Sequence, residues 1–405
     1  MSDPVAMTST VLSPARTDPS PWPVVGSGLV ALAVAMGIGR FAFTPLMPLM
    51  MRDGTLTAAI GAEWAAANYA GYLAGALTAS WFADNPRRGL VASLLGVAAT
   101  TLAMAQAGGS GSVVIGAVLR ALAGVFSAWS LICASGWCLP ELARRRVPQW
   151  GAWIYTGVGL GIALAGAFAW LGGGQPARAL WIELGTMAAA GAAAVLGLSR
   201  GQGPTPAAVV EREAAATVQA PRRGTTGLVL CYGTFGFGYI VPATFLPAMA
   251  RELTPDPLVF GLAWPLFGLA AALSVAAVAR WLPRMPRLRL WALAQGLMAI
   301  GTALPVAAQT LWAVAASAVF VGGTVMVATM AGLQFAREAR PDNPTPLLSR
   351  MTAAFAAGQI VGPVLVRALG PGRWAGWDAL GLTGALATLL LVLTALWLWH
   401  ADRQS

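Results

Sequence analysis

Three ionisable side chains, Arg40, Glu63 and Arg120, interrupt long apolar runs in the first half of the chain. A charge at membrane depth is costly, so it usually faces a cavity or an opposite charge and is a candidate functional group. At about 1.5 Å of rise per helical residue, the three lie roughly 15, 9 and 12 Å from the predicted outer ends of their runs. We therefore predict that they occupy a similar layer.

The chemistry of this trio follows from its mixture of an acid and two bases. A carboxylate can exchange a proton, whereas an arginine stays charged. We predict that Glu63 pairs with Arg40 or Arg120, and that protonation of Glu63 rearranges the network. The alternative is a static ion pair that fixes helix packing. Arg40 has a second possible use, as the anchor for an anionic group of a solute, and the sequence does not separate these roles.

Glycines four residues apart recur within the apolar runs. This spacing lets two helix backbones approach closely, either as a fixed contact or as a face that slides. A proline inside a helix removes a backbone donor, so Pro363 should break or bend its run. The predicted packing or gating glycines are Gly71, Gly75, Gly157, Gly161, Gly358 and Gly362.

The apolar runs themselves place the chain in a lipid bilayer. Of its 405 residues, 57% are apolar and 10% are charged. A soluble domain of this size has too few interior positions to hide so much apolar surface, whereas a membrane helix needs about 20 such residues. We predict an all-α membrane protein with twelve transmembrane helices, at about 24–50, 58–82, 89–107, 112–138, 149–171, 179–198, 225–250, 258–280, 290–307, 311–335, 348–369 and 377–399.

Polar segments divide these runs six and six. We predict a disordered tail over 1–22, a first six-helix bundle over 23–198, a linker over 199–224, a second bundle over 225–400 and a tail over 401–405. The bundles repeat in parallel, because two tryptophan pairs and two proline pairs recur at offsets of 199 and 200. Such a repeat is typical of transporters with two halves, although it could also build a static bundle. The matching pairs are Trp64 with Trp264, Trp81 with Trp281, Pro48 with Pro247 and Pro86 with Pro286.

The arginines orient the chain. Most lie in the tails, the linker and alternate short loops, and positive loops tend to be cytoplasmic. We therefore predict a bacterial inner-membrane protein with both termini in the cytoplasm. The basic residues, which give a net charge of +10, form no stripe or block, so nucleic-acid binding is not predicted. The arginines on the predicted outer side are Arg52, Arg178, Arg251, Arg367 and Arg373.

The sequence lacks the residues that metal binding, disulfide formation and nucleotide hydrolysis would need. The three cysteines form no Cys-x-x-Cys pair and the only histidine is His400, so we predict no metal site, no disulfide framework and no cofactor. The chain contains no lysine and no phosphate-binding Gly-x-x-x-x-Gly-Lys-[Ser/Thr] loop, which excludes that route to nucleotide hydrolysis. We predict that the protein is not an enzyme.

Several segments resemble the YbfB/YjiJ-type family of major facilitator transporters. They are Gly37-Ile-Gly-Arg-Phe-Ala-Phe-Thr-Pro45, Asn68-Tyr-Ala-Gly-Tyr-Leu-Ala-Gly75, Arg120-Ala-Leu-Ala-Gly124, Gly157-Val-Gly-Leu-Gly161, Gly236-Phe-Gly-Tyr-Ile-Val-Pro-Ala-Thr-Phe-Leu-Pro247 and Gly358-Gln-Ile-Val-Gly-Pro363. The resemblance implies the twelve-helix fold and solute transport, but no particular substrate. It also implies that Arg120-x-x-x-Gly124 is the fourth-helix arginine motif associated with proton coupling. The loop at 83–88 only loosely matches the usual gating loop.

The resemblance further implies that a set of uncharged polar residues lies around a central cavity. Each of them could instead form a hydrogen bond with a neighbouring helix. The set is Asn68, Tyr72, Tyr239, Thr244, Gln334 and Gln359.

Together these features predict a monomeric secondary transporter that moves a small organic solute by alternating access. Proton coupling is expected from the predicted network, and the glycines of the fifth span, which faintly resemble an antiporter motif without its proline, favour export over import. The rival interpretation is a membrane receptor or scaffold that keeps the fold but transports nothing. A large soluble domain would favour that rival, and the sequence predicts none.

Overall fold

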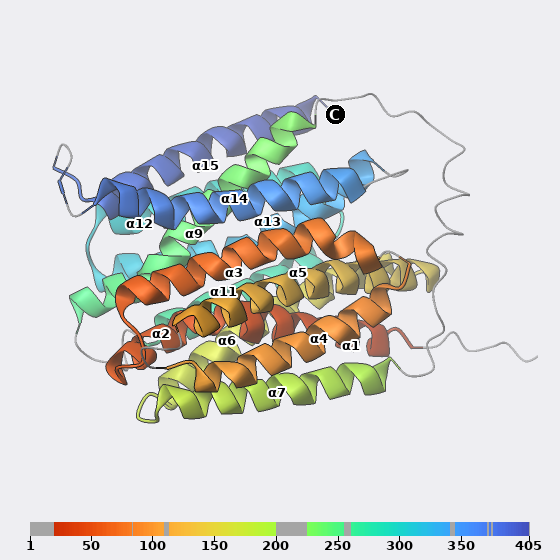
Figure 1. Ribbon diagram of the computed structural model, residues 1–405. Coiled ribbons are helices and arrows are strands. Elements are labelled where there is room, and N and C mark those ends of the chain that lie inside the picture. Colours follow the sequence, from red (N-terminus) through yellow and green to blue (C-terminus); the bar gives the residue numbers. More distant parts are fainter. Residues whose placement is uncertain are drawn as a thin grey trace, which may run out of the picture.

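The computed structural model describes residues 20–82, 84–108, 113–199, 225–254, 261–340, 345–370, 372–373 and 376–404. These residues form a bundle of long helices that run in roughly the same direction (Figure 1), and no strand occurs among them. The predicted all-α fold is confirmed for this part of the chain. Most of the predicted tail and linker, residues 1–19 and 200–224, lies outside the described residues.

The helices follow the predicted runs closely, because each apolar stretch must satisfy its own backbone hydrogen bonds in lipid. The first run is divided into α1 (Trp22–Leu32), the π-helical segment η1 (Ala33–Phe41) and α2 (Phe43–Arg52). The others are α3 (Ala58–Thr78) with η2 (Ala79–Phe82), α4 (Pro86–Ala103) with η3 (Met104–Gln106), α5 (Val113–Arg144), η4 (Pro148–Tyr155) with α6 (Thr156–Leu171), α7 (Ala177–Leu198), α9 (Thr226–Leu253), α11 (Ala263–Trp281), α12 (Arg287–Ala307), α13 (Leu311–Ala339), α14 (Thr345–Leu369) and α15 (Ala379–Arg403).

Eleven of the described helical stretches are long and apolar enough to cross a membrane. The predicted span that is not among them is α3, which carries Glu63, Asn68 and two tyrosines. It nevertheless packs along α5 and α14 inside the bundle. The polar composition of α3 is therefore accommodated by neighbouring helices.

Some helices extend past the predicted ends of their apolar runs. α5 continues to Arg144, where Glu141 accepts hydrogen bonds from Arg144 and Arg145 one turn later. α15 continues to Arg403 through residues predicted to be a tail, and Asp402 there accepts a hydrogen bond from Arg289 at 2.8 Å. Hydropathy marks the part of a helix in lipid, so it misses turns that extend beyond the bilayer.

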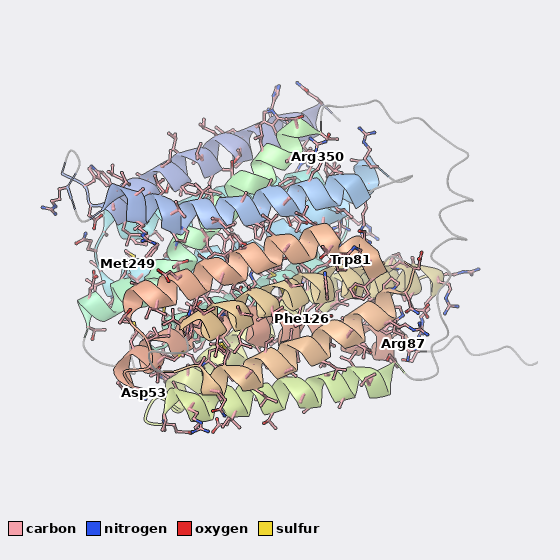
Figure 2. The ribbon with its side chains drawn as sticks, in the orientation of Figure 1. Asp53, Trp81, Arg87, Phe126, Met249 and Arg350 are labelled. Atoms are coloured by element: carbon pink, nitrogen blue, oxygen red, sulfur yellow. The ribbon has the colours of Figure 1, made fainter. Side chains whose placement is uncertain are left out.

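The helices before and after the linker make most of their contacts within their own group. The main contacts between the groups join α6 to α11 and α3 to α14; Figure 1 shows α3 and α14 side by side. In Figure 2, Arg87 and Arg350 lie at one end of the bundle, whereas Asp53 and Met249 lie at the other. This arrangement matches the predicted alternation of the loops, while the cytoplasmic position of the termini stays a prediction.

Glycines let the helix backbones touch. A Cβ on Gly71 would lie 1.9 Å from the carbonyl oxygen of Ala121, and one on Gly161 would lie 2.2 Å from that of Ala33. A Cβ on Gly358 would lie 2.2 Å from the carbonyl oxygen of Gly233. These contacts join α3 to α5, α6 to η1 and α14 to α9. The predicted glycines Gly75 and Gly157 make similar backbone contacts, and Gly362 lies against the Ile240 side chain.

Of the predicted break or bend at Pro363, the break is not found, and the bend stays a prediction. α14 is one continuous helix from Thr345 to Leu369, with Pro363 inside it. In transmembrane helices a proline is tolerated because local adjustments and neighbouring groups satisfy the freed carbonyl.

Candidate functional site

A small cavity lies at the centre of the bundle, between the two groups of helices. Its volume is about 20 Å³, which is room for roughly one water molecule. Arg40 is the only charged residue that lines it. The other lining residues are Met36, Phe41, Tyr72, Leu131, Val158, Tyr232, Tyr239, Met326, Thr329, Leu333, Thr352 and Phe355.

Arg40 connects the two groups of helices across this cavity. Its side chain is 3% exposed, and Nη2 donates a hydrogen bond to Oε1 of Gln359 on α14. Nε2 of Gln359 donates in turn to the hydroxyl of Tyr239 on α9. Three residues predicted separately from the sequence therefore form one hydrogen-bonded chain.

Aromatic rings surround the Arg40 guanidinium. Its carbon Cζ lies 3.8 Å from the ring centre of Tyr72, 5.4 Å from that of Phe41 and 5.8 Å from that of Tyr69. A guanidinium over an aromatic face is attracted by the negative charge density of the ring. The rings thus stabilise a cation that forms no ion pair with a carboxylate in the described part of the chain.

The hydrogen bonds of Arg40 are incomplete. Its Nε and Nη1 atoms are buried and have no partner. Each unsatisfied buried donor costs about 1–3 kcal/mol, and more on a charged group. The ion pairs among the described residues involve Asp53, Glu141, Glu338 and Asp402, near the ends of the bundle, and none of them reaches Arg40. The cavity is therefore positively charged and has donors available.

Arg120 has a different environment from Arg40, although both are 3% exposed. Its Nη1 donates to the carbonyl of Gly39 at 3.0 Å, and its Nη2 donates to that of Arg40 at 2.9 Å. In a π-helical pattern the backbone donor for Arg40 would be Pro45, which has no N–H. Arg120 thus supplies donors at the end of η1, and it does not line the cavity.

Asn68 supports the same arrangement. Its Nδ2 donates to the carbonyl of Arg120 at 2.9 Å, and the residue is 1% exposed. A Cβ on Gly124 would lie 2.1 Å from the Asn68 carbonyl oxygen, so α3 and α5 are in backbone contact here. Asn68 fixes these two helices and does not line the cavity.

Glu63 does not join the two arginines, and the predicted pairing is wrong. Its side chain is exposed, and it forms no ion pair with Arg40 or Arg120. The buried face of α3 carries Trp64, Asn68 and Gly75, and successive helical residues are separated by about 100°. Glu63 is therefore turned away from the interior even though its depth along the helix is as predicted.

Two other predicted polar residues also lie outside the set that lines the cavity. Gln334 is partly buried, and its Oε1 atom has no hydrogen-bond partner. Thr244 is partly buried on α9. The neighbour of Gln334 along α13, Leu333, lines the cavity instead.

The residues that the sequence did not reveal are mostly apolar or aromatic. Tyr232 and Phe355 line the cavity beside Tyr239, and the rings of Tyr239 and Phe355 are stacked at 5.5 Å with 3° between their planes. Aromatic residues at helical spacing are as typical of a packed core as of a binding site, so the sequence alone gives no signal. Thr329 and Thr352 also line the cavity and were not predicted from the sequence.

One missed contact did have a signal in the sequence. A Cβ on Gly159 of α6 would lie 2.2 Å from the backbone nitrogen of Ala272, and one on Gly268 of α11 would lie 2.2 Å from that of Ala163. The two helices thus cross at backbone contact between the groups. Gly159 stands between Gly157 and Gly161 and so faces the opposite side of its helix, a periodicity visible in the sequence.

Comparison with known proteins agrees with the geometry. No curated protein matches the chain. The family described as the uncharacterised MFS-type transporter YbfB matches residues 32–398, which is nearly the whole chain. The resemblance inferred from the sequence motifs is therefore confirmed, and the chain belongs to this family of MFS-type transporters.

Proposed function

We propose that this family member is a secondary active transporter of small organic anions, which binds them at Arg40. The observation that carries the proposal is the pair of buried, unpartnered donors on Arg40, at a cavity lined from both groups of helices. A family of transporters is not enzymatic, so an anion held here would be carried and not converted. Binding near the middle of the bundle is the usual arrangement in secondary transporters.

An anion would offset the main energetic cost of the site. A buried charge without a partner is strongly destabilising, and its cost falls when an opposite charge comes into hydrogen-bonding contact. A carboxylate or sulfonate has two or more oxygens that can accept from Nε and Nη1 of Arg40. A cation would meet repulsion from the same guanidinium, so the site discriminates by sign.

Alternating access would move the bundle over 23–198 against the bundle over 225–400. We propose that these are the two repeated halves, and that they rock about the α6–α11 contact while the α3–α14 contact opens. Opening the cavity would then separate Arg40 from Gln359, since these residues belong to different halves. The hydrogen bond between them supports the closed form.

The other transport properties predicted from the sequence are proposed here as well. Proton coupling, export, a monomeric state and an inner-membrane location with cytoplasmic termini are proposed on the sequence features given above. Because Glu63 is exposed and apart from Arg40, its predicted coupling role would have to operate without a direct ion pair.

Transport assays in proteoliposomes test the proposal. The purified full-length protein is reconstituted, and uptake of labelled organic anions (aliphatic monocarboxylates, dicarboxylates and aromatic sulfonates) is measured with and without an imposed pH gradient. We expect uptake of at least one class above that of protein-free vesicles, and its loss in Arg40→Gln. The matched control is Arg350→Gln, which changes an exposed arginine at the start of α14 and should leave uptake unchanged.

Two results would contradict the proposal. Uptake that is unaffected by Arg40→Gln would remove Arg40 from the binding site. Absence of uptake for every anion, with a folded protein in the vesicles, would favour the rival interpretation of a receptor or scaffold.

A further inference from the structure

We infer that the central site selects monoanions with a flat aromatic body, with the anionic group on Arg40 and Gln359 and the ring between Tyr72 and the Tyr239–Phe355 pair. The inference rests on the proposed function, because it assigns a substrate class to the same site. It is drawn from three properties of the cavity: its single charge, the shape of its walls and its scarcity of polar partners.

The charge of the cavity fits one anionic group. Arg40 is the only charged residue among those lining the cavity. Arg120, the other buried arginine, directs both Nη groups to backbone carbonyls of η1. A second carboxylate on the ligand would therefore find no second cation, and its desolvation would not be compensated.

Five aromatic rings line the cavity, those of Phe41, Tyr72, Tyr232, Tyr239 and Phe355. The parallel rings of Tyr239 and Phe355 form one wall, and the ring of Tyr232 adjoins Phe355 with a centroid distance of 5.4 Å. Tyr72, from the other half of the chain, holds its ring 3.8 Å from Cζ of Arg40. An aromatic ligand beside these faces gains stacking contacts worth about 0.5–1.5 kcal/mol per ring pair beyond its buried area.

Other solute classes lack partners here. An amino acid would bring an ammonium group, and no carboxylate lines the cavity to receive it. A sugar would need several hydrogen-bonding groups, but the Thr329 hydroxyl already donates to the Val325 carbonyl at 2.8 Å. Apart from Arg40, the polar groups of the lining are only threonine and tyrosine hydroxyls.

The present cavity of about 20 Å³ must widen to admit a ring. Widening separates the Tyr72 side from the Tyr239–Phe355 side, and so releases Gln359 from Arg40. An arriving anion can then accept from Arg40 in place of the Gln359 carbonyl oxygen, while the Gln359 amide Nε2 can donate to the anion. This exchange makes Gln359 and Tyr239 determinants of specificity.

Calorimetry at pH 7 tests the inference. It measures the binding of four probes to the purified full-length protein in detergent. The probes are benzoate, benzamide (neutral and flat), cyclohexanecarboxylate (charged and not flat) and acetate. We expect benzoate to bind at least tenfold more tightly than cyclohexanecarboxylate or acetate, and at least a hundredfold more tightly than benzamide. Arg40→Gln should abolish benzoate binding.

Variants of the wall provide the matched comparison. Phe355→Leu should weaken benzoate about tenfold and leave acetate unchanged, and Phe355→Tyr, which keeps the ring, should restore benzoate. Phe126→Leu is the control, since Phe126 of α5, labelled in Figure 2, packs against Trp129 and is not among the residues that line the cavity; it should change neither affinity.

The outcomes separate the two proposals. If all three anions bind equally and all are lost in Arg40→Gln, the aromatic preference is wrong and the anion site stands. If no probe binds, or if benzoate binds equally well to Arg40→Gln, the anion site itself is refuted. If Phe126→Leu weakens benzoate as much as Phe355→Leu does, the wall assigned here does not contact the ring.

Discussion

The glycine contact between α6 and α11 gives a prediction whose size follows from the geometry. In Gly268→Ala the new Cβ would lie 2.2 Å from the backbone nitrogen of Ala163, whereas ordinary contact begins near 3.4 Å. The obstacle is backbone, which cannot rotate away, so the helices must separate by roughly 1 Å or be strained. Overpacking of this kind costs about 1–3 kcal/mol.

The assay is thermal unfolding of the purified full-length variants in one detergent. We expect Gly268→Ala to lower Tm by a few degrees. Gly296→Ala, in the middle of α12, is the matched control. Its new Cβ would meet only the Ala395 Cβ, at 3.9 Å. An alanine is favoured over glycine in a helix by about 1 kcal/mol, so this control should be neutral or slightly stabilising.

A double variant tests whether the contact is shared. Gly159→Ala should cost as much as Gly268→Ala, because each Cβ points at the backbone of the other helix. Once one alanine has separated the helices, the second meets less resistance, so the double variant should cost less than the sum by about 0.5–3 kcal/mol. Equal stability of Gly268→Ala and Gly296→Ala, or strict additivity of the pair, would refute the tight crossing.

Three further predictions concern the charged residues. Arg120→Met should lower Tm and weaken benzoate binding together, since it removes both donors to η1; weaker binding with an unchanged Tm would instead indicate direct contact with the ligand. Glu63→Gln should leave benzoate affinity within about twofold in calorimetry, because Glu63 is exposed and away from Arg40; a larger loss would contradict its placement. Burial raises the pKa of Asp53, but the hydrogen bond from Ala177 N–H and the Arg52 ion pair outweigh burial and hold that pKa below the ordinary 3.8. Asp53 therefore stabilises the fold at a pH above its pKa in the unfolded chain. This contribution is lost as the pH falls through the pKa of Asp53 in the folded protein. The Tm difference between wild type and Asp53→Asn should accordingly be constant at neutral pH and shrink as the pH falls through the folded-state pKa; a difference that stays unchanged in acid would contradict it.

The sequence predicted where the helices lie along the chain better than it predicted which side of each helix faces the interior. Apolar runs located each of the long helices among the described residues, because lipid imposes a length on each crossing. Glu63 was placed at the correct position along α3 and on the wrong side of it, since position along a helix depends on residue count whereas the side that a residue faces depends on helical phase. The spacing of Trp64, Asn68 and Gly75 already defined the inner face of α3, and it excludes Glu63.

The site was predicted in part because charge is visible in an apolar sequence and packing is not. Arg40 and Arg120 stand out among alanines and leucines, and both are buried. The aromatic residues Tyr232 and Phe355 have no such mark, because a ring in the core and a ring at a cavity have the same sequence pattern. Only the packing of α9 against α14 brings the Phe355 ring into contact with the rings of Tyr232 and Tyr239.

The different environments of Arg40 and Arg120 follow from the π-helical segment η1. Wide helical turns leave carbonyls without regular partners and often occur at functional sites. Here Arg120 donates to the carbonyls of Gly39 and Arg40, and so holds the backbone from which the Arg40 side chain projects. With those carbonyls satisfied by Arg120, two donors of Arg40 remain for a ligand. We therefore propose that Arg120, on the fourth span, positions the backbone of η1, and that Arg40, on the first span, binds the ligand.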